Sequence, residues 1–164
     1  MRGQQRELSF RFMAQPGDVN FGGKVHGGAV MRWIDQTGYA AAVAWSGAYC
    51  VTAAVSSIQF LQPIRIGDLV SVQAKLIHTG HSSMQFAVDV LARDLRQGQS
   101  RLTTSCVMVF VAVDAEAEHP IEVPKWTPTE PDDLKLAAYA ERLSEISRSM
   151  EKPLREDHPG IVER

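Results

Sequence analysis

Two adjacent glycines and one carboxylate lie within a short stretch of this chain, and together they could support chemistry on a carbonyl group. Gly27 and Gly28 end a polar, glycine-rich loop, and Asp35 follows in an almost unbroken apolar run. A glycine pair costs backbone entropy unless a tight turn or a close ligand requires it. A carboxylate in apolar surroundings is costly unless it is paired or used. Residues 18–46 are therefore the predicted site.

The glycines are suited to the start of a helix, where backbone N–H groups lack partners. Such an end carries partial positive charge and can stabilise negative charge that develops on an oxygen. The glycines would let a reacting carbonyl approach these amides, although they could equally serve only a tight loop-to-helix turn. Asp35 is the candidate base or nucleophile. The structural alternative is a pair with Arg32, one helical turn earlier.

The spacing of these groups argues against their acting together within one chain. Gly28 and Asp35 fall on nearly the same helical face, but the 1.5 Å rise per residue separates them by roughly 10 Å along the axis. Two such helices facing each other across a dimer would bring Asp35 of one chain close to Gly28 of the other. We therefore predict a composite site between subunits.

The elements that must position this stretch indicate an α+β fold. Residues 7–13 show a strand pattern, and residues 28–45 are rich in alanine and long enough for a helix. Four further strand patterns, separated by short turns, predict an antiparallel meander; they cover 50–62, 69–79, 84–91 and 101–113. The last of them is apolar on both faces, which is typical of a central strand. A helix that is apolar nearly all round should be buried on most sides, so we expect the sheet to curl around it.

Composition changes towards the carboxyl end of the chain. The main domain is predicted over residues 1–123, and residues 124–150 comprise a proline-rich connector and an amphipathic helix. Asp132 and Asp133 suit the first turn of that helix. Residues 151–164 are charged, contain two prolines, and are predicted to be disordered.

The bulk composition limits the classes of function. With 164 residues, 45% apolar residues, 22% charged residues and a net charge of −2, the chain resembles an ordinary soluble domain. No basic cluster predicts nucleic-acid binding, and no apolar run reaches the roughly 18 residues of a membrane span. The charged amino-terminal residues lack a secretion signal. Cys50 and Cys106 are expected to be buried thiols, which suits a reducing cytoplasm.

The ordered motifs of the chain resemble those of hotdog-fold acyl-CoA thioesterases, most closely the short-chain bacterial type related to cytosolic acyl-CoA hydrolases. The resemblance covers roughly residues 8–135. The motifs are Asp18-x-Asn20-x-x-Gly23-x-x-His26-Gly27-Gly28 with Asp35, the block from Phe60 to Asp68, the block from Thr79 to Met84, and the block from Phe110 to Asp114.

The resemblance implies a hotdog fold in which an antiparallel curved sheet wraps around one long helix. It implies a homodimer with a continuous sheet as the minimal active unit, and a hexamer built as a trimer of dimers. The implied substrate is an acyl-CoA thioester, hydrolysed without a cofactor or metal. The Gly28 amide, with that of Gly27, would bind the thioester oxygen, and Asp35 would act as the catalytic carboxylate.

The resemblance also implies roles for other residues. Asn20 matches a loop asparagine that positions water or the thioester carbonyl, although asparagine is also a common turn residue. His26 could contact substrate, cap the helix or pack, and Asp18 is expected to order the loop. Contacts to CoA are expected from His81, Ser82 and Ser83. His81 replaces the arginine usual there, which removes a charge-assisted phosphate contact.

Other chemistries lack comparable support in the sequence. No His, Cys and carboxylate spacing predicts a metal site, and no nucleophile-elbow serine is present. The main alternative to hydrolysis is a non-catalytic acyl-CoA-binding or regulatory hotdog module. A hotdog hydratase or dehydratase and a purely structural dimer are further alternatives. Whether Asp35 attacks directly or activates water is left open, as is the acyl chain length.

Overall fold

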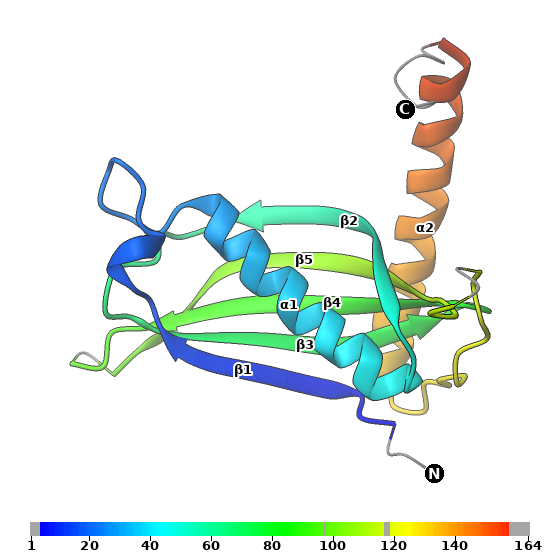
Figure 1. Ribbon diagram of the computed structural model, residues 1–164, viewed down its shortest axis with the longest axis horizontal. Helices are drawn as coiled ribbons and strands as arrows, with labels where there is room; N and C mark the ends of the chain where they lie inside the picture. Colours follow the sequence, from blue (N-terminus) through cyan, green and yellow to red (C-terminus); the bar gives the residue numbers. More distant parts are fainter. Residues whose placement is uncertain (1–3, 97, 117–118, 158–164) are drawn as a thin grey trace. The chain divides into compact units, whose positions relative to one another are not determined.

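A five-stranded antiparallel sheet with one helix lying across it forms the larger unit of the computed structural model (Figure 1). The structure describes residues 4–96, 98–116 and 119–157, with side chains as far as Met150. These residues divide into two compact units, Met1–Trp126 and Thr127–Arg164. The α+β architecture predicted from the sequence is confirmed.

The elements of the larger unit follow the predicted order closely. Strand β1 precedes a short 3-10 helix, η1, and the long helix α1, and four strands follow. Their bounds are β1 (Glu7–Met13), η1 (Pro16–Asp18), α1 (Gly27–Ser46), β2 (Cys50–Phe60), β3 (Leu69–Thr79), β4 (Ser83–Arg93) and β5 (Ser100–Ala112).

The strand order corrects the predicted four-strand meander. The order in the sheet is β1-β3-β4-β5-β2, so only β3, β4 and β5 form a meander. Strand β2 pairs with β5, and β1 takes the place beside β3. Residues 61–68 are long enough to carry the chain across the end of the sheet. As predicted, β5 is not an edge strand, because it lies between β4 and β2, and β2 is left with a free edge.

Helix α1 is bounded by a cap at each end and buries one face against the sheet. His26 caps its start, and Gly47, with a φ of 70°, ends it by donating its N–H to the carbonyl of Val43 at 2.8 Å. The buried residues are Ala29, Val30, Trp33, Ile34, Thr37, Gly38, Ala41, Ala42 and Trp45. The expectation of burial on most sides is wrong for the single chain. The sheet covers only one face, and the opposite face leaves Met31 and Tyr39 47% and 39% exposed.

Helix α1 approaches the sheet closely at Gly38. A Cβ atom at this position would lie 2.7 Å from Cε2 and 2.9 Å from Cζ of Phe110. Phe110 is fully buried on β5 and makes an edge-to-face contact with Phe86 on β4. The helix can therefore cross β5 at this depth only because residue 38 has no side chain.

The boundary of the larger unit lies slightly beyond the predicted position at residue 123. Val123 is 4% exposed and belongs to the hydrophobic core. The N–H of Trp126 donates to Oγ1 of Thr79 at 3.0 Å, and the indole N–H of Trp45 donates to the carbonyl of Pro124 at 2.8 Å. These contacts hold the connector to the unit as far as Trp126.

The second unit contains the predicted carboxyl-terminal helix, α2 (Pro131–Asp157), with Asp132 and Asp133 in its first turn. The helix continues past Met150, so residues 151–157 correct the predicted disordered tail. Most of these residues are good helix formers, although proline at position 153 removes a backbone donor and crowds the carbonyl four residues earlier. Residues 158–164 lie outside the described residues. No helix in the described part of the chain combines the length and apolarity of a membrane span.

Candidate active site

The first turn of α1 presents two free backbone donors. Nδ1 of His26 accepts the N–H of Ala29 at 3.0 Å, and the carbonyl of His26 accepts the N–H of Val30 at 3.3 Å. The N–H groups of Gly27 and Gly28 have no acceptor in the part of the chain that the structure describes. An anion or a developing oxyanion is the ligand that such a helix end favours.

The two glycines differ in what surrounds them. A Cβ atom at Gly28 would lie 3.1 Å from Nδ1 of His26, so a side chain there would disturb the capping ring. A Cβ atom at Gly27 would lie 3.5 Å from Cζ of Phe60, which is an ordinary contact distance. His26 therefore has the capping role that the sequence left open, and Gly28 permits that cap to close.

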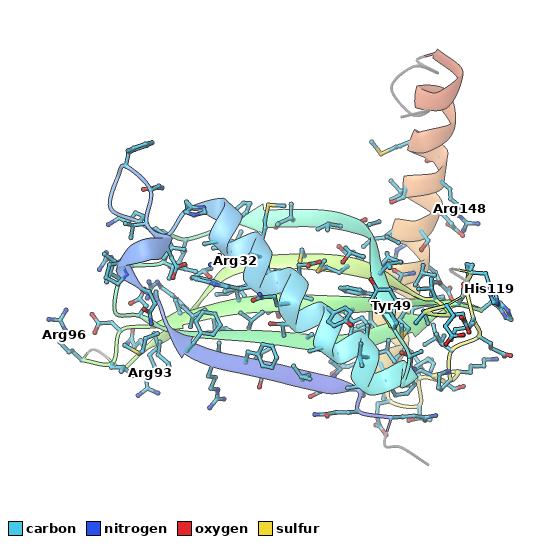
Figure 2. The ribbon with its side chains drawn as sticks, in the orientation of Figure 1. Arg32, Tyr49, Arg93, Arg96, His119 and Arg148 are labelled. Carbon is cyan, nitrogen blue, oxygen red and sulfur yellow. The ribbon has the colours of Figure 1, made fainter. Side chains whose placement is uncertain are left out.

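The loop before α1 is ordered by Asp18, as expected. One carboxylate oxygen of Asp18 accepts a hydrogen bond from Arg32 at 3.2 Å, and the other accepts the N–H of Gln15 at 3.1 Å. Arg32, marked on α1 in Figure 2, thus pairs with the loop. The alternative pair between Arg32 and Asp35 does not form.

Asn20 combines a turn role with a free amide group. Its Oδ1 accepts the N–H groups of Gly22 at 2.9 Å and Lys24 at 3.2 Å, and its own N–H donates to the Lys24 carbonyl at 2.7 Å. Its side-chain NH₂ has no acceptor among the described residues. The structure is therefore compatible with both predicted roles of Asn20, as a turn residue and as a group that positions water or the thioester carbonyl.

Asp35 lies on the open face of α1 and is held by a residue that the sequence analysis missed. Its Oδ1 accepts a hydrogen bond from the hydroxyl of Thr52 on β2 at 2.6 Å. Asp35 is exposed in the single chain, between Met31 and Tyr39 on the same helical stripe. No local pattern predicts the role of Thr52, because threonine is a common residue in strands. Its hydrogen bond to Asp35 becomes apparent only when β2 packs beside α1.

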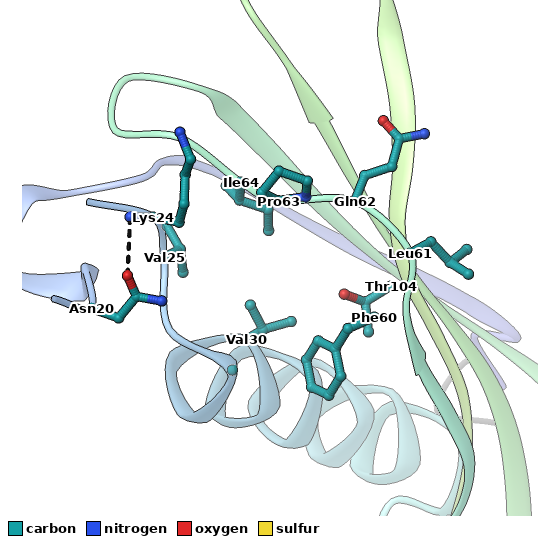
Figure 3. Close-up of a pocket in the computed structure, with 11 residues that line it drawn as sticks. Asn20, Lys24, Val25, Val30, Phe60, Leu61, Gln62, Pro63, Ile64 and Thr104 are labelled. Carbon is teal, nitrogen blue, oxygen red and sulfur yellow. Dashed lines mark hydrogen bonds between the residues drawn. The ribbon is translucent and has the colours of Figure 1, made fainter. Parts of the chain in front are cut away.

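A cavity of about 390 Å³ opens beside Gly27 (Figure 3). It lies between the start of α1, the end of β2 and the loop after β2. Its walls are mainly apolar, with a few polar groups at its margin. The lining residues are Asn20, Lys24, Val25, Gly27, Val30, Phe60, Leu61, Gln62, Pro63, Ile64 and Thr104.

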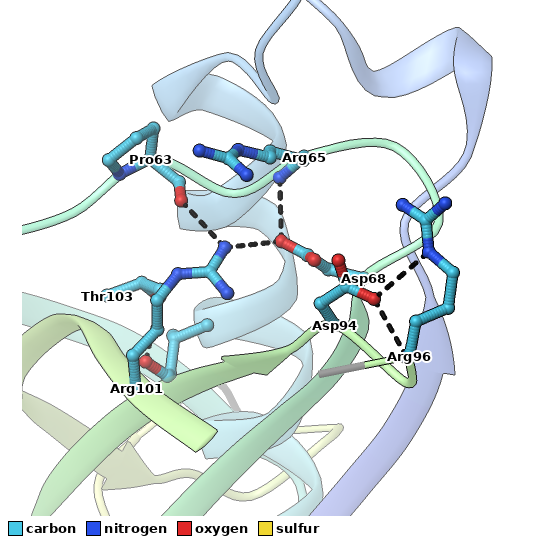
Figure 4. Close-up of polar contacts among 8 residues, drawn as sticks. Pro63, Arg65, Asp68, Asp94, Arg96, Arg101 and Thr103 are labelled. Carbon is cyan, nitrogen blue, oxygen red and sulfur yellow. Dashed lines mark hydrogen bonds and ion pairs between the residues drawn. The ribbon is translucent and has the colours of Figure 1, made fainter. Parts of the chain in front are cut away.

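A partly buried ion pair fixes the loop that forms one wall of this cavity (Figure 4). Asp68, 3% exposed, pairs with Arg101 of β5 and accepts the N–H of Arg65 at 2.8 Å. Arg101 also donates to the carbonyl of Pro63 at 3.1 Å. A buried carboxylate is tolerated when it is paired and hydrogen-bonded, and here that pairing attaches residues 63–68 to the sheet.

The predicted CoA contacts His81, Ser82 and Ser83 lie at the other end of the sheet from Gly27. Ser83 pairs with Val111, which pairs with Val51 near the start of β2, whereas Phe60 beside Gly27 ends that strand. The carbonyls of His81 and Ser82 accept the N–H groups of Val123 and Ala112, each at 2.9 Å. Within one chain, the turn at residues 81–83 therefore lies near the start of β2, where Thr52 binds Asp35.

The two thiols offer no nucleophile. Cys50 and Cys106 are free and buried, as predicted. Burial, reinforced by the nearby Asp89 carboxylate, raises the pKa of Cys106 to about 12. Burial also raises the pKa of Cys50, although a hydrogen bond with Ser46 acts in the opposite direction. Both thiols stay protonated at neutral pH, and only the thiolate is nucleophilic. No group of three or more potential metal-ligating side chains occurs within the described ranges.

Comparison with known proteins identifies relatives in sequence and in fold. Residues 22–99 match the model of the Thioesterase superfamily. The acyl-CoA thioester hydrolase YciA of Salmonella typhimurium is 30% identical over 117 residues, which cover 70% of this chain and 88% of that protein. A hexameric thioesterase from Yersinia pestis is 34% identical, with a TM-score of 0.66 over 71% of this chain and 93% of that one.

The acyl-CoA hydrolase of Staphylococcus aureus, solved in complex with butyryl coenzyme A, coenzyme A and coenzyme A disulfide, has the same fold. Its TM-score is 0.85, with 25% identity and 96% coverage of both chains. Further structures of that enzyme carry alanine in place of one aspartate or one threonine. The spacing between those two positions equals the spacing between Asp35 and Thr52 in this chain.

Proposed function

The chain belongs to the acyl-CoA thioester hydrolases of the thioesterase superfamily, and we propose that it hydrolyses acyl-CoA thioesters at a site shared by two copies of the chain. The observation that carries this proposal is the arrangement on α1. Free amides occupy its first turn, and about two turns later Asp35 is held by Thr52 at 2.6 Å. One helix thus supplies an oxyanion-binding end and a carboxylate.

The amides of Gly27 and Gly28 bind the thioester oxygen in this mechanism. They polarise the carbonyl and stabilise the negative charge that the oxygen gains when the carbon becomes tetrahedral. The positive end of the helix dipole acts in the same direction. The free NH₂ group of Asn20 is close enough to the cavity to donate to the substrate, while its Oδ1 keeps the loop in place.

Asp35 either takes a proton from a water molecule, whose oxygen then attacks the carbonyl carbon, or attacks that carbon with its own carboxylate oxygen. In both routes the tetrahedral intermediate collapses, the C–S bond breaks, and CoA leaves as a thiolate that is then protonated. The direct route forms an anhydride, which water hydrolyses. Thr52 is a positioning residue, because its hydroxyl holds one carboxylate oxygen and leaves the other for the reaction.

The free edge of β2 is the surface that would join two copies. The strand has eleven residues, and Val51, Val55 and Phe60 on it are 37%, 42% and 53% exposed. A long apolar edge strand promotes pairing with another strand unless it is covered. Antiparallel pairing of β2 with β2 of a second copy covers this edge and extends the sheet. Met31 and Tyr39 on the open face of α1 would be covered at the same time.

This pairing would bring the two halves of the site together. Thr52 lies near the start of β2 and Phe60, beside Gly27, at its end. A two-fold axis near the middle of β2 brings the Thr52 end of one chain close to the Phe60 end of the other. Asp35 of one copy would then face Gly27 and Gly28 of its partner. His81, Ser82 and Ser83 would belong to the copy that supplies the aspartate.

We further propose a hexamer, as a trimer of such dimers. The Yersinia pestis relative is described as hexameric, and that chain matches this one over 93% of its own length. The dimer remains the minimal unit in this proposal, because each site needs groups from only two chains.

The test is hydrolysis of a panel of acyl-CoA thioesters, followed by release of the CoA thiol. Asp35→Asn keeps the shape and the hydrogen bond to Thr52 but removes the base. We expect kcat to fall by about 10²–10⁴-fold, the usual contribution of a positioned base. The matched control is Asp132→Asn on α2, an exposed aspartate outside the site, which should leave kcat unchanged.

Two results would contradict the proposal. Wild-type rates of thiol release from Asp35→Asn would exclude Asp35 as the catalytic carboxylate. Tight CoA binding by the wild-type chain, with no thiol release over the whole panel, would instead favour the non-catalytic acyl-CoA-binding module.

A further inference from the structure

We infer that the cavity beside Gly27 holds the acyl chain of the substrate, and that Phe60 sets the longest chain it accepts. The inference rests on the proposed function. It concerns the substrate class: straight-chain acyl groups of short to medium length. It adds a specificity-determining residue to the groups that bind and activate the thioester.

The apolar walls favour the acyl chain over the pantetheine arm. The buried part of the wall includes Val25, Val30 and Ile64, which are 8%, 3% and 2% exposed and offer no hydrogen-bonding side chains. The polar lining residues are Asn20, Lys24 and Gln62, which are exposed at the margin, and the buried Thr104. A pantetheine arm carries two amides, and burying an amide without a partner is costly. The volume of about 390 Å³ is near the lower end of the ~300–1,000 Å³ that is typical of small-ligand pockets. A thioester carbonyl bound at Gly27 therefore has room for a limited hydrocarbon chain.

Strand β2 contains a distortion that directs Phe60 into this cavity. Ser56 pairs with Val107 and Gln59 with Ser105, so an extra residue opposes Cys106 in a β-bulge. Ser57 in this bulge has a φ of 54°, a left-handed conformation that non-glycine residues seldom adopt. Bulges often occur beside active sites, where they redirect a side chain.

The alternation of side chains gives the direction of this effect. Val55 pairs with the buried Met108 and shares its face of the sheet. In a regular strand, Phe60 would then point to the opposite face, since it is an odd number of residues away. The extra residue in the bulge instead places Phe60 on the same face as Val55. Phe60 pairs there with Thr104, which also lines the cavity.

The position of Phe60 at the end of β2 makes it a boundary of the cavity rather than part of the core. Its ring lies in van der Waals range of a Cβ atom built on Gly27, at 3.5 Å and 3.6 Å, yet the residue is 53% exposed. A smaller side chain would lengthen the space beside the helix end, and a larger one would shorten it. Because the residue is half exposed in the single chain, its replacement should leave the fold of that chain intact, and size-exclusion chromatography of each variant checks that pairing through β2 is kept.

The experiment compares kcat/KM for straight-chain acyl-CoA thioesters from acetyl to dodecanoyl. Phe60→Ala should raise the ratio of long-chain to short-chain kcat/KM by at least about tenfold, the effect expected of one methylene in an apolar pocket. Phe60→Trp should lower the same ratio. Ile66→Ala is the matched control, since Ile66 is a comparably exposed apolar residue, 49%, that does not line this cavity. Urea unfolding of each variant checks the fold, and Phe60→Leu replaces Phe60→Ala if the alanine variant is unfolded.

An unchanged chain-length profile in folded Phe60 variants, with Asp35→Asn inactive, would overturn the role of Phe60 and leave the proposed hydrolysis intact. An equal shift in Ile66→Ala would also overturn it. Full activity of Asp35→Asn would instead contradict the catalytic proposal. The two failures are therefore distinguishable.

Discussion

At the scale of single residues, the main chain contributes as much to the candidate site as the side chains do. His26 takes up the N–H of Ala29, which leaves the amides of Gly27 and Gly28 for a ligand. Thr52 fixes one oxygen of Asp35 across the gap between β2 and α1. The role of the amides and the role of the carboxylate can therefore each be tested by a substitution that removes a single group of atoms.

Gly27 provides a direct test of the oxyanion-binding amide. It is the first helical residue after the His26 cap, a position where proline is well tolerated and where the preceding residue is already extended, with ψ of 149°. Gly27→Pro should retain the fold and lower kcat by about 10²–10³-fold, the usual effect of losing one oxyanion donor. Steady-state thiol-release kinetics, with the unfolding midpoint in urea, would measure both effects.

The matched control is Gly27→Ala, which keeps the N–H group and adds a methyl group 3.5 Å from the Phe60 ring. If the proline and alanine variants had the same kcat, the amide of Gly27 would have no part in the reaction.

At the scale of elements, helix α1 must cross the sheet at a fixed depth for both parts of the site to be placed. Gly38 allows this crossing, since any side chain there would meet the ring of the buried Phe110 at 2.7 Å. The loop of residues 63–68 is likewise fixed to β5 through Asp68 and Arg101. The cavity therefore has one wall set by helix–sheet packing and another set by a partly buried ion pair.

Gly38→Ala tests the helix crossing. Alanine favours a helix over glycine by about 1 kcal/mol, whereas overpacking a dense core costs about 1–3 kcal/mol. The overlap with Phe110 should prevail because that ring is fully buried against Phe86, and the added methyl group would also lie 3.3 Å from Sδ of Met108. We expect a net decrease of about 1–2 kcal/mol in the free energy of unfolding, measured by urea denaturation. An increase in stability would mean that the helix can move away from β5 at little cost. Gly17→Ala, where nothing lies within 4 Å of the added methyl group, is the control.

At the scale of the whole molecule, the single chain leaves two features incomplete. Its β2 edge is apolar and unpaired with another strand, and its α1 presents Asp35 on an open face between exposed Met31 and Tyr39. A second copy paired through β2 would complete both. Dimerisation would then be a condition of activity rather than an added source of stability.

Mixed dimers test this dependence. Asp35→Asn and Gly27→Pro chains should each be inactive alone, because every site lacks one group. In a dimer of the two variants, one site combines the intact Asp35 of one chain with the intact Gly27 of the other. Random mixing should therefore restore about a quarter of the wild-type activity, since half of the dimers are mixed and one of their two sites is intact.

Subunits would be mixed by joint refolding or co-expression, and thiol release would be measured at equal total protein. Activity no greater than that of the separate variants would show that both groups act within one chain. The control mixes two preparations of Asp35→Asn, which should stay inactive.

Much of this architecture follows from local patterns. The alternation of β3, β4 and β5, the alanine-rich run of α1 and the turn residues between strands specify the elements, because side-chain periodicity and turn chemistry are local properties. The spacing between Gly28 and Asp35 likewise requires a separation of about two helical turns, whatever the surroundings. The sequence by itself thus determined the elements and the separation of Gly28 from Asp35, and from that separation it predicts a second chain.

Only the tertiary structure decided the contacts between distant segments. The pairing of β2 with β5 and of β1 with β3 depends on the competition of all strands for partners, so the prediction of a four-strand meander was wrong. The partnership of Thr52 with Asp35 and the direction of Phe60 depend on register and on a bulge at Ser57, and neither leaves a local pattern. Periodicity specifies which face of an element is apolar, whereas packing specifies what that face meets.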